Sequence, residues 1–364
     1  MIGLWQCLKK SFAQYERYLS AGALLLGFII DSITLTRVDL LFDNLVLLWY
    51  LVLAAGGIAL FNMIEEGKIH IRLLARAAPL FPLLAQYAFG GLFSGYFIFY
   101  SRSASAFGSW VFVLALVALL IGNERFKEQY LRFRFQIGIL FVALFSFTIF
   151  SLPVLLKSIG PGIFLLSGVV SIGLIALFVY ALSKSMPQKV RAAQRGIAVI
   201  VGSVYLAFNA LYFAGAIPPL PLSLKEIGVY HSVNRLSGGS YVGVYEPAPR
   251  YAFYSDSSKT FHRTKGEAVT VFSAVFAPTD LAVAVLHEWQ YFDDARQRWV
   301  TTDILSFPIV GGRDGGYRGY STKAGVFEGR WRVEVITQHG QRIGQIRFSV
   351  QNTLKSPKIE ERML

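Results

Sequence analysis

Long apolar runs dominate the first 217 residues of the chain and determine its predicted architecture. A helix needs about 20 mostly apolar residues to cross the hydrocarbon core of a bilayer. Seven runs meet this need, at 18–36, 45–63, 79–101, 104–122, 137–156, 160–182 and 196–217. The last run ends at Ile217, before Pro218-Pro219-Leu220-Pro221, and proline cannot donate the hydrogen bond that continues a helix. The sequence therefore predicts a seven-helix transmembrane domain over 1–217.

After a predicted Pro-rich linker over 218–226, the hydrophobic pattern changes from helical spacing to alternation. Trp331, Val333 and Val335 lie on one face of a predicted strand, and the polar residues between them lie on the other. Short alternating strands separated by Gly, Pro and Asp turns are typical of an antiparallel sandwich. We predict an all-β, Ig-like sandwich of about seven strands over 227–350 and a charged tail over 351–364.

Basic residues are concentrated in the N-terminus and in every second loop between the predicted spans. Positive charge near the end of a span is retained on the cytoplasmic side. The basic-rich segments contain Lys9, Lys10, Arg17, Lys68, Arg72, Arg76, Arg125, Lys127, Arg132, Arg134, Lys184, Lys189, Arg191 and Arg195. The alternate loops contain Arg37, Arg102 and Lys157. This pattern predicts a cytoplasmic N-terminus and an external domain after residue 217.

Composition agrees with a membrane protein. Hydrophobic residues make up 54% of the chain and charged residues 16%, and the mean hydropathy is +0.49. Soluble domains carry about 25% charged residues. The net charge of +13 indicates membrane topology and contact with anionic membrane lipids. Nucleic acid is not a predicted partner, because most Phe residues lie inside the apolar runs. The single cysteine, Cys7, excludes an intrachain disulfide.

The sequence predicts no catalytic residue, no metal site and no cofactor. Its 5 histidines are scattered, whereas metal sites need clustered ligands. No Gly-x-Ser-x-Gly nucleophile elbow and no Walker-type or dinucleotide-binding loop is present. His287 shares a predicted strand face with Val285 and Trp289, so we predict that it is a hydrogen-bonded core residue.

One stretch of the external domain, 311–320, is rich in glycine, arginine and tyrosine. Glycine allows close approach of the backbone to a ligand, arginine binds anions, and tyrosine supplies rigid contact area or stacks on sugar rings. The predicted ligand-binding residues are Arg313, Tyr317, Arg318, Tyr320 and Lys323. The alternative interpretation is a β-loop whose arginines are simply solvated.

Three polar residues of the predicted spans form a second hypothesis. Asp31, Arg102 and Asn209 each fall in the outer half or at the outer end of a predicted span. Charged groups are costly in lipid, so we expect these three to form an intramembrane polar cluster. The cluster is either a structural Asp31–Arg102 pair that docks helices or part of a substrate or proton path.

Several motifs in the external domain resemble a known family. They are His287-Glu288-Trp289, Gly311-Gly312-Arg313, the stretch 317–323 and the stretch 329–335. In this order they resemble the C-terminal domain of a bacterial family of unknown function, number two-nine-one-four. The stretch 27–35 and Tyr100-Ser101-Arg102-Ser103 resemble the membrane portion of its longer members. The resemblance implies a periplasmic domain on an anchor in the bacterial inner (plasma) membrane, and it transfers no activity.

Together these observations favour a binding role over an enzymatic one. We expect a multi-pass inner-membrane protein whose periplasmic β-sandwich binds an envelope component: an anionic glycan, a lipid headgroup or an envelope protein. The alternative is a membrane-embedded transporter or enzyme that carries the sandwich as an accessory domain.

Overall fold

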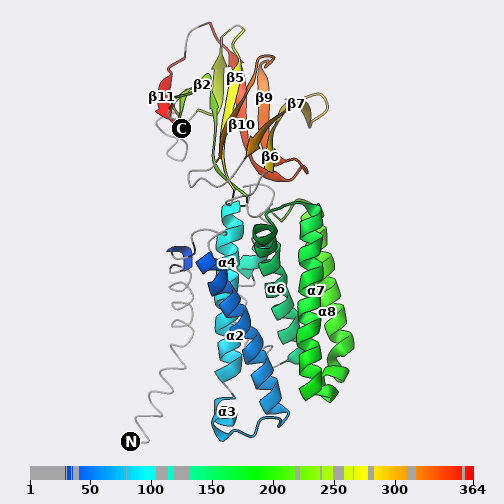
Figure 1. Ribbon diagram of the computed structural model, residues 1–364. Helices are drawn as coiled ribbons and strands as arrows, with labels where there is room; N and C mark the ends of the chain where they lie inside the picture. Colours follow the sequence, from blue (N-terminus) through cyan, green and yellow to red (C-terminus); the bar gives the residue numbers. More distant parts are fainter. Residues whose placement is uncertain are drawn as a thin grey trace, which may run out of the picture. The chain divides into compact units, whose positions relative to one another are not determined.

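The computed structural model shows helices followed by strands (Figure 1). It describes residues 29, 31–33, 35, 41–78, 80–103, 114–118, 132–217, 222–237, 240–248, 258–264, 266–277, 283–309, 317–354 and 357–364. The chain divides into two compact units. The first contains the long helices up to Ala214, and the second contains the strands after Gly215 together with the short segment Pro153–Pro161. We call them the helical unit and the strand unit.

Six helices of the helical unit have described bounds. They are α2 (Leu41–Glu65), α3 (Arg72–Ala77), α4 (Leu80–Ser103), α6 (Phe133–Leu156), α7 (Pro161–Ser185) and α8 (Pro187–Phe213). Four helices of the described chain are long and apolar enough to cross a membrane: α2 from Phe42 onward, α6, α7 and α8. They overlap the predicted spans 45–63, 137–156, 160–182 and 196–217, and α8 begins nine residues before its predicted span. The predicted span 79–101 lies on α4, while 18–36 and 104–122 fall largely outside the described residues.

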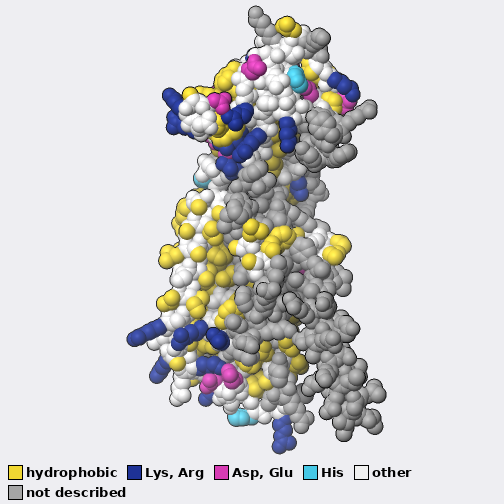
Figure 2. Space-filling view, turned by 180° about the vertical axis from the view of Figure 1, so that it is seen from behind, with side chains coloured by type: hydrophobic (Ala, Val, Ile, Leu, Met, Phe, Trp, Pro, Cys, Tyr) yellow, Lys and Arg dark blue, Asp and Glu magenta, His cyan; other side chains and the backbone are white. Residues whose placement is uncertain are grey.

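Aromatic rings and small residues hold the helical unit together. Phe145 of α6 stacks on Phe208 of α8 with ring centroids 4.7 Å apart, and Phe164 of α7 stacks on Tyr212 of α8 at 3.8 Å. A methyl group at Gly91 of α4 would lie 2.7 Å from the Tyr50 ring of α2, so glycine permits this close approach. Hydrophobic side chains cover much of the visible outer surface of this unit (Figure 2), as expected of helices that face lipid.

Eleven described strands of the strand unit form three sheets. The first sheet has the order β1 (Ser223–Tyr230), β5 (Val269–Phe276), β8 (Tyr317–Lys323). The second has the order β4 (Thr260–Arg263), β10 (Arg342–Asn352), β9 (Gly329–Thr337), β6 (Val283–Asp293), β7 (Arg298–Ile309). The third has the order β11 (Glu360–Met363), β3 (Tyr241–Tyr245), β2 (Ser232–Arg235).

Strand β5 is the centre of this arrangement because every one of its residues is buried. Alternate residues of a strand point to opposite faces. On one face Val269 and Val271 pack with Trp289 and Trp331 of the five-stranded sheet. On the other face, Phe272 packs in a core with residues of β1, of β2 and of the C-terminal end of the chain.

The strand count and the layering therefore differ from the sequence-based expectation of about seven strands in one antiparallel sandwich. The three-stranded sheet of β1, β5 and β8 packs against the five-stranded sheet as in a sandwich, and the third sheet adds another layer. The reason is that β5 is apolar on both faces. In addition, β10 and β4 pair in parallel, so the five-stranded sheet is mixed.

The last residues of the predicted charged tail over 351–364 form strand β11. Strand β11 pairs antiparallel with β3, and Leu364 is only 8% exposed. Glu360, Glu361 and Arg362 of this strand are charged. On an edge strand such side chains remain in water or pair locally, as Arg362 does with Glu226 of β1. Strand β1 begins at Ser223, inside the predicted linker 218–226.

Candidate functional site

Strand β8 carries most of the predicted ligand-binding residues. It is an edge strand that pairs with β5 within its sheet. Residues 317–323 are therefore a strand instead of part of a loop, and Arg313 lies outside the described residues. Alternation places Arg318 and Tyr320 on one face, where both are exposed, and places Tyr317 and Lys323 on the opposite face, where both are half-buried. The structure thus separates the predicted residues into two pairs.

The exposed pair lies beside an aromatic and a basic residue of the third sheet. The Tyr320 ring contacts the Tyr241 ring edge to face, with centroids 6.1 Å apart. The Tyr241 hydroxyl group donates a hydrogen bond to the Arg318 carbonyl oxygen at 3.4 Å. The Arg235 guanidinium lies 5.9 Å from the centroid of the Tyr241 ring. We call Arg235, Tyr241, Arg318 and Tyr320 the β8 surface.

The β8 surface has the chemistry of an anion or sugar site. Tyr320 is 41% exposed, so its ring is available to a ligand. Among the residues that the structure describes, no acidic side chain forms an ion pair with Arg235 or Arg318. Arginine donates fork-shaped pairs of hydrogen bonds to carboxylates, sulfates and phosphates, while tyrosine rings provide flat contact area.

The inward pair on β8 has a structural role. The Lys323 ammonium pairs with the Asp303 carboxylate of β7 and lies 5.9 Å from the centroid of the Trp331 ring. Tyr317 packs against the core cluster that contains Val275 and Val285. Both side chains connect the two sheets at their edge, so the structure does not place them with Arg318 and Tyr320.

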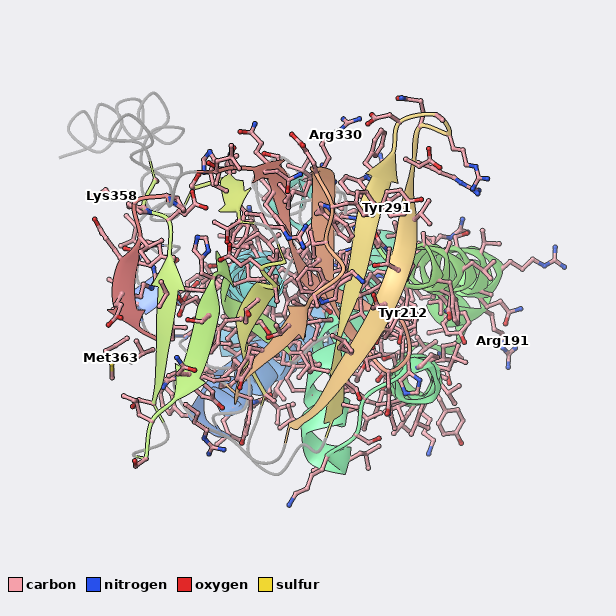
Figure 3. The ribbon with its side chains drawn as sticks, turned by 90° about the horizontal axis from the view of Figure 1, so that it is seen from above. Arg191, Tyr212, Tyr291, Arg330, Lys358 and Met363 are labelled. Carbon is pink, nitrogen blue, oxygen red and sulfur yellow. The ribbon has the colours of Figure 1, made fainter. Side chains whose placement is uncertain are left out.

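A second basic and aromatic surface, which the sequence did not predict, lies on the outer face of the five-stranded sheet. The Arg330 guanidinium lies 3.9 Å from the centroid of the Phe292 ring, and the Arg332 guanidinium lies 4.5 Å from that of Trp299. These arginines have acidic partners: Arg330 pairs with Asp294, and Arg332 lies 3.2 Å from Glu334. Their alternation with Trp331 was visible in the sequence, whereas the pairing with β6 and β7 was not. Figure 3 labels Arg330 of this surface.

His287 is fully buried, which confirms the prediction of a hydrogen-bonded core residue. Its Nε2 atom lies 2.8 Å from the Ser273 hydroxyl oxygen, and its Nδ1 atom lies 2.8 Å from the Ser321 hydroxyl oxygen. The indole N–H of Trp289 donates to the same Ser321 oxygen at 3.0 Å. Burial lowers the pKa of His287 to about 3, so the imidazole is neutral at physiological pH.

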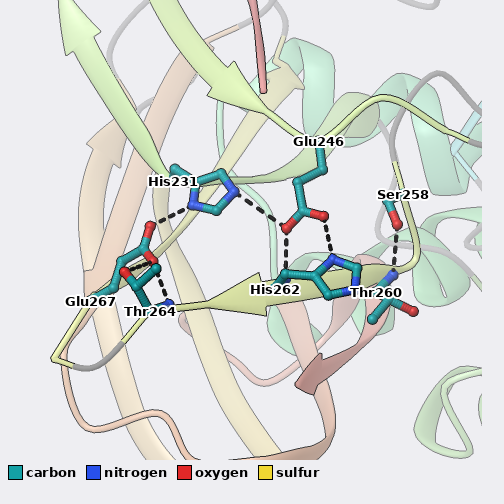
Figure 4. A network of polar contacts seen from close by, with 7 residues as sticks. All are labelled: His231, Glu246, Ser258, Thr260, His262, Thr264 and Glu267. Atoms are coloured by element: carbon teal, nitrogen blue, oxygen red, sulfur yellow. Dashed lines mark hydrogen bonds and ion pairs between the residues drawn. The ribbon is translucent and has the colours of Figure 1, made fainter. Parts of the chain in front are cut away.

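Two histidines and two glutamates form a polar cluster at another place in the strand unit (Figure 4). His231 lies between β1 and β2. Its Nδ1 atom is 2.5 Å from a carboxylate oxygen of Glu267, and its Nε2 atom is 3.3 Å from a carboxylate oxygen of Glu246. The His262 Nδ1 atom of β4 lies 2.6 Å from the other oxygen of Glu246. The Thr264 N–H donates to Glu267 at 2.8 Å. We call this the His231 cluster.

The His231 cluster is an ion-pair network, and it was missed because its members are far apart in the sequence. Among the described residues no group of three His, Cys, Asp or Glu side chains is arranged to hold a metal ion. Burial lowers the pKa of His231, but hydrogen bonds to Glu246 and Glu267 outweigh burial and raise it overall. Burial raises the pKa of each glutamate, but hydrogen bonds outweigh it and lower the pKa of Glu246 and of Glu267. The network therefore favours the charged forms of all three groups.

We expect the His231 cluster to stabilise the strand unit most strongly between about pH 4.5 and 6.5. Because the folded pKa of His231 is raised, its contribution is complete below its unfolded pKa and is lost as the pH rises through the folded value. Because the folded pKa values of the glutamates are lowered, their contribution is lost as the pH falls through them. Unfolding by urea at a series of pH values should show the largest difference between wild type and His231→Gln in that window. A difference that does not vary with pH would contradict the linkage.

The intramembrane residues are only partly described. Asp31 is half-buried in a short helical stretch. The Asn209 amide group of α8 donates to the Tyr205 carbonyl oxygen, one turn earlier in the same helix, at 2.8 Å. Arg102 lies on α4, and its side chain is outside the described part. The Asp31–Arg102 pair thus stays a prediction, and the described contact of Asn209 is local.

A family model matches residues 283–350, and its description is "Protein of unknown function (DUF2914)". A comparison with curated proteins gives no match. Among solved structures, the alkylpurine DNA glycosylase AlkC of Pseudomonas fluorescens, bound to DNA containing an abasic site analog, aligns with 87% of this chain and 100% of its own. The sequence identity is 10% and the TM-score 0.24, so this likeness carries no argument. The family match runs from the start of β6 into β10 and confirms the resemblance that the motifs of the external domain predicted. Residues 283–350 of this chain are similar to the DUF2914 family.

Proposed function

We propose that this chain is a seven-span protein of the bacterial inner membrane that binds an anionic envelope polymer through its periplasmic strand unit. The β8 surface is the observation that carries the proposal. Two arginines without a described acidic partner lie beside two tyrosine rings there, and one of those rings is well exposed. By contrast, Arg330 and Arg332 on the outer face of the five-stranded sheet have acidic partners. An acidic glycan or a lipid headgroup offers the groups that such a surface recognises.

The domain organisation is part of the proposal. The four membrane-compatible helices of the described chain and the alternation of basic loops support a membrane domain over about 1–217 with a cytoplasmic N-terminus. The facing sheets of β1, β5, β8 and of β4, β10, β9, β6, β7 would be the Ig-like sandwich of the periplasmic domain. The third sheet would then be an addition that carries Arg235 and Tyr241 of the β8 surface.

Binding can be tested with the full-length protein in detergent micelles. The probe is polygalacturonate, an anionic polysaccharide, and uncharged dextran is the comparison. Replacing both Arg235 and Arg318 with glutamine should weaken binding of polygalacturonate by about tenfold or more, because each loss removes a charge-assisted contact. Binding should also weaken as salt rises, since exposed charges are screened.

The matched control replaces Arg330 and Arg347, two arginines of the other sheet, with glutamine. It removes the same charge and should leave binding within about twofold of wild type. If this control weakens binding as much as the β8 variant does, the β8 surface is not the site. Transport or turnover by the full-length protein, unaffected by the β8 variant, would favour the alternative of a transporter or enzyme.

Topology gives an independent prediction. Cys7 should be reached from the cytoplasm only, and a cysteine introduced by Lys358→Cys should be reached from the periplasm. A membrane-impermeant maleimide applied to intact spheroplasts should therefore label Lys358→Cys in a Cys7→Ser background and leave wild type unlabelled. Labelling of Cys7 alone would reverse the orientation, and labelling of both would contradict the span count.

A further inference from the structure

A cavity with basic residues at its rim lies between the starts of α6 and α8 in the helical unit. Its volume is about 610 Å³, which is within the usual range of ligand pockets. Arg132, Arg134 and Lys189 supply its charge, and its apolar lining includes Phe133, Phe135 and Ile200. A ligand that fills it must therefore combine an anionic group with a hydrocarbon part.

The cavity lies at the starts of two candidate membrane-spanning helices. Phe133 is the first residue of one candidate span, and Pro187 is the first residue of another. Arg132 and Lys189 are within two residues of these starts, which is about 3 Å along a helix axis. Farther along the two helices, α6 and α8 are in close contact at Gly138 and Ile200. A methyl group at Gly138 would lie only 2.6 Å from the Ile200 side chain. The charged end of the cavity is thus at headgroup depth and its apolar end points toward the hydrocarbon.

Arg134 is held in position by α8. One of its terminal nitrogens donates to the Ala192 carbonyl oxygen at 3.0 Å. Its side chain crosses α8 at Gly196, where a methyl group would lie 2.7 Å from the Arg134 Cδ atom. A guanidinium has five N–H donors, so the single bond to Ala192 leaves capacity for a forked contact with a phosphate.

The charge balance of the cavity favours an anion. Lys189 pairs with Glu65 and lies 3.8 Å from Glu66, both at the end of α2. Neither Arg132 nor Arg134 forms an ion pair with an acidic side chain of the described residues. Figure 2 shows Lys and Arg side chains gathered toward one end of the helical unit, next to acidic side chains. The two arginines therefore leave an excess of positive charge at the rim.

We propose that this cavity binds the phosphate headgroup of an anionic phospholipid. Arg132 and Arg134 contact the phosphate, and Phe133, Phe135 and Ile200 contact the first part of an acyl chain. This site is in the helical unit and is independent of the β8 surface, so it goes beyond the proposed function. Basic pockets between transmembrane helices are suited to anionic headgroups, because charge attraction and apolar contact act on the same molecule.

The test uses full-length protein in neutral detergent micelles, titrated with short-chain phosphatidylglycerol. The readouts are the thermal midpoint and the number of lipid molecules retained in native mass spectrometry. Wild type should show saturable binding with a rise in the midpoint. Arg132→Gln together with Arg134→Gln should weaken the apparent affinity by about tenfold or more. Arg132→Gln alone should also weaken it, and it leaves the Arg134–Ala192 contact intact, so a folding defect is not expected.

The matched control is Arg191→Gln with Arg195→Gln, two exposed arginines of α8 outside the cavity. Figure 3 shows Arg191 extending away from the helix. This control removes the same charge and should bind phosphatidylglycerol as wild type does. Equal weakening by both pairs would overturn the proposal in favour of diffuse surface charge. Equal affinity for phosphatidylcholine or for free glycerol phosphate would also overturn it, since the site would then not select an anionic lipid.

Discussion

Replacing Trp331 with alanine is expected to lower the free energy of unfolding of the strand unit by about 3–5 kcal/mol. Trp331 is fully buried in the core between β5 and the five-stranded sheet. Its ring lies 4.9 Å from the Phe327 ring, centroid to centroid, and its indole N–H donates to the Phe327 carbonyl oxygen at 2.8 Å. Truncation would leave a cavity and remove the hydrogen bond to the Phe327 carbonyl group.

Urea unfolding of the full-length protein, followed by the β-sheet circular dichroism signal, measures this loss. The control is Trp299→Ala, because Trp299 is half-buried on the outer face of the same sheet and should cost about 1 kcal/mol or less. Trp331→Phe should recover most of the loss, since the ring volume is largely kept. Similar losses at positions 299 and 331 would contradict the position of Trp331 in the core.

Acid is expected to destabilise the strand unit through His287. The folded pKa of about 3 is below the unfolded value of about 6.5, so the unfolded chain binds a proton that the folded chain excludes. Stability is therefore complete above the unfolded pKa and falls as the pH drops from about 6.5 toward 3, by on the order of 4 kcal/mol at the lower end. This loss is larger than any expected change at the more exposed His231 cluster.

The measurement compares unfolding free energies of wild type and His287→Gln across the same pH range. Glutamine can still bond to Ser273 or Ser321 but takes up no proton, so the variant should start less stable at neutral pH and lose less in acid. The difference between the two profiles isolates His287 from the other titrating groups. Parallel profiles would show that His287 does not cause the acid sensitivity. If His287→Gln lost more unfolding free energy in acid than wild type does, proton uptake at His287 would not be what destabilises the folded state.

The sites differ in how far the sequence could predict them. Arg318 and Tyr320 were selected from composition, and both are on an exposed face. Their separation from Tyr317 and Lys323 was not expected, because the stretch 311–320 was interpreted as a glycine-rich loop. Because residues 317–323 form a strand, consecutive side chains point to opposite faces of the sheet. The contribution of Arg235 and Tyr241 depends on a third sheet that the sequence did not predict.

The His231 cluster and the cavity at Arg134 could not have been predicted from local patterns. The cluster joins positions 231, 246, 262 and 267, which come together only through strand pairing and loop conformation. The cavity depends on the packing of α6 against α8 at Gly138 and Ile200. Both are contacts between segments far apart in the chain, and the spacing of residues within a segment carries no information about its partner.

The sequence by itself determined the local properties of this protein. Apolar length predicted the membrane-compatible helices. Alternation predicted that Trp331, Val333 and Val335 of β9 are buried on one face, because side chains of a strand point alternately to its two faces. The family match rests on the same local motifs. Only the tertiary structure decided that β5 is covered on both faces, that Leu364 is buried and that Arg134 lies across α8. These features depend on which elements pair and in what register, and burial and hydrogen bonding summed over the whole domain select that pairing.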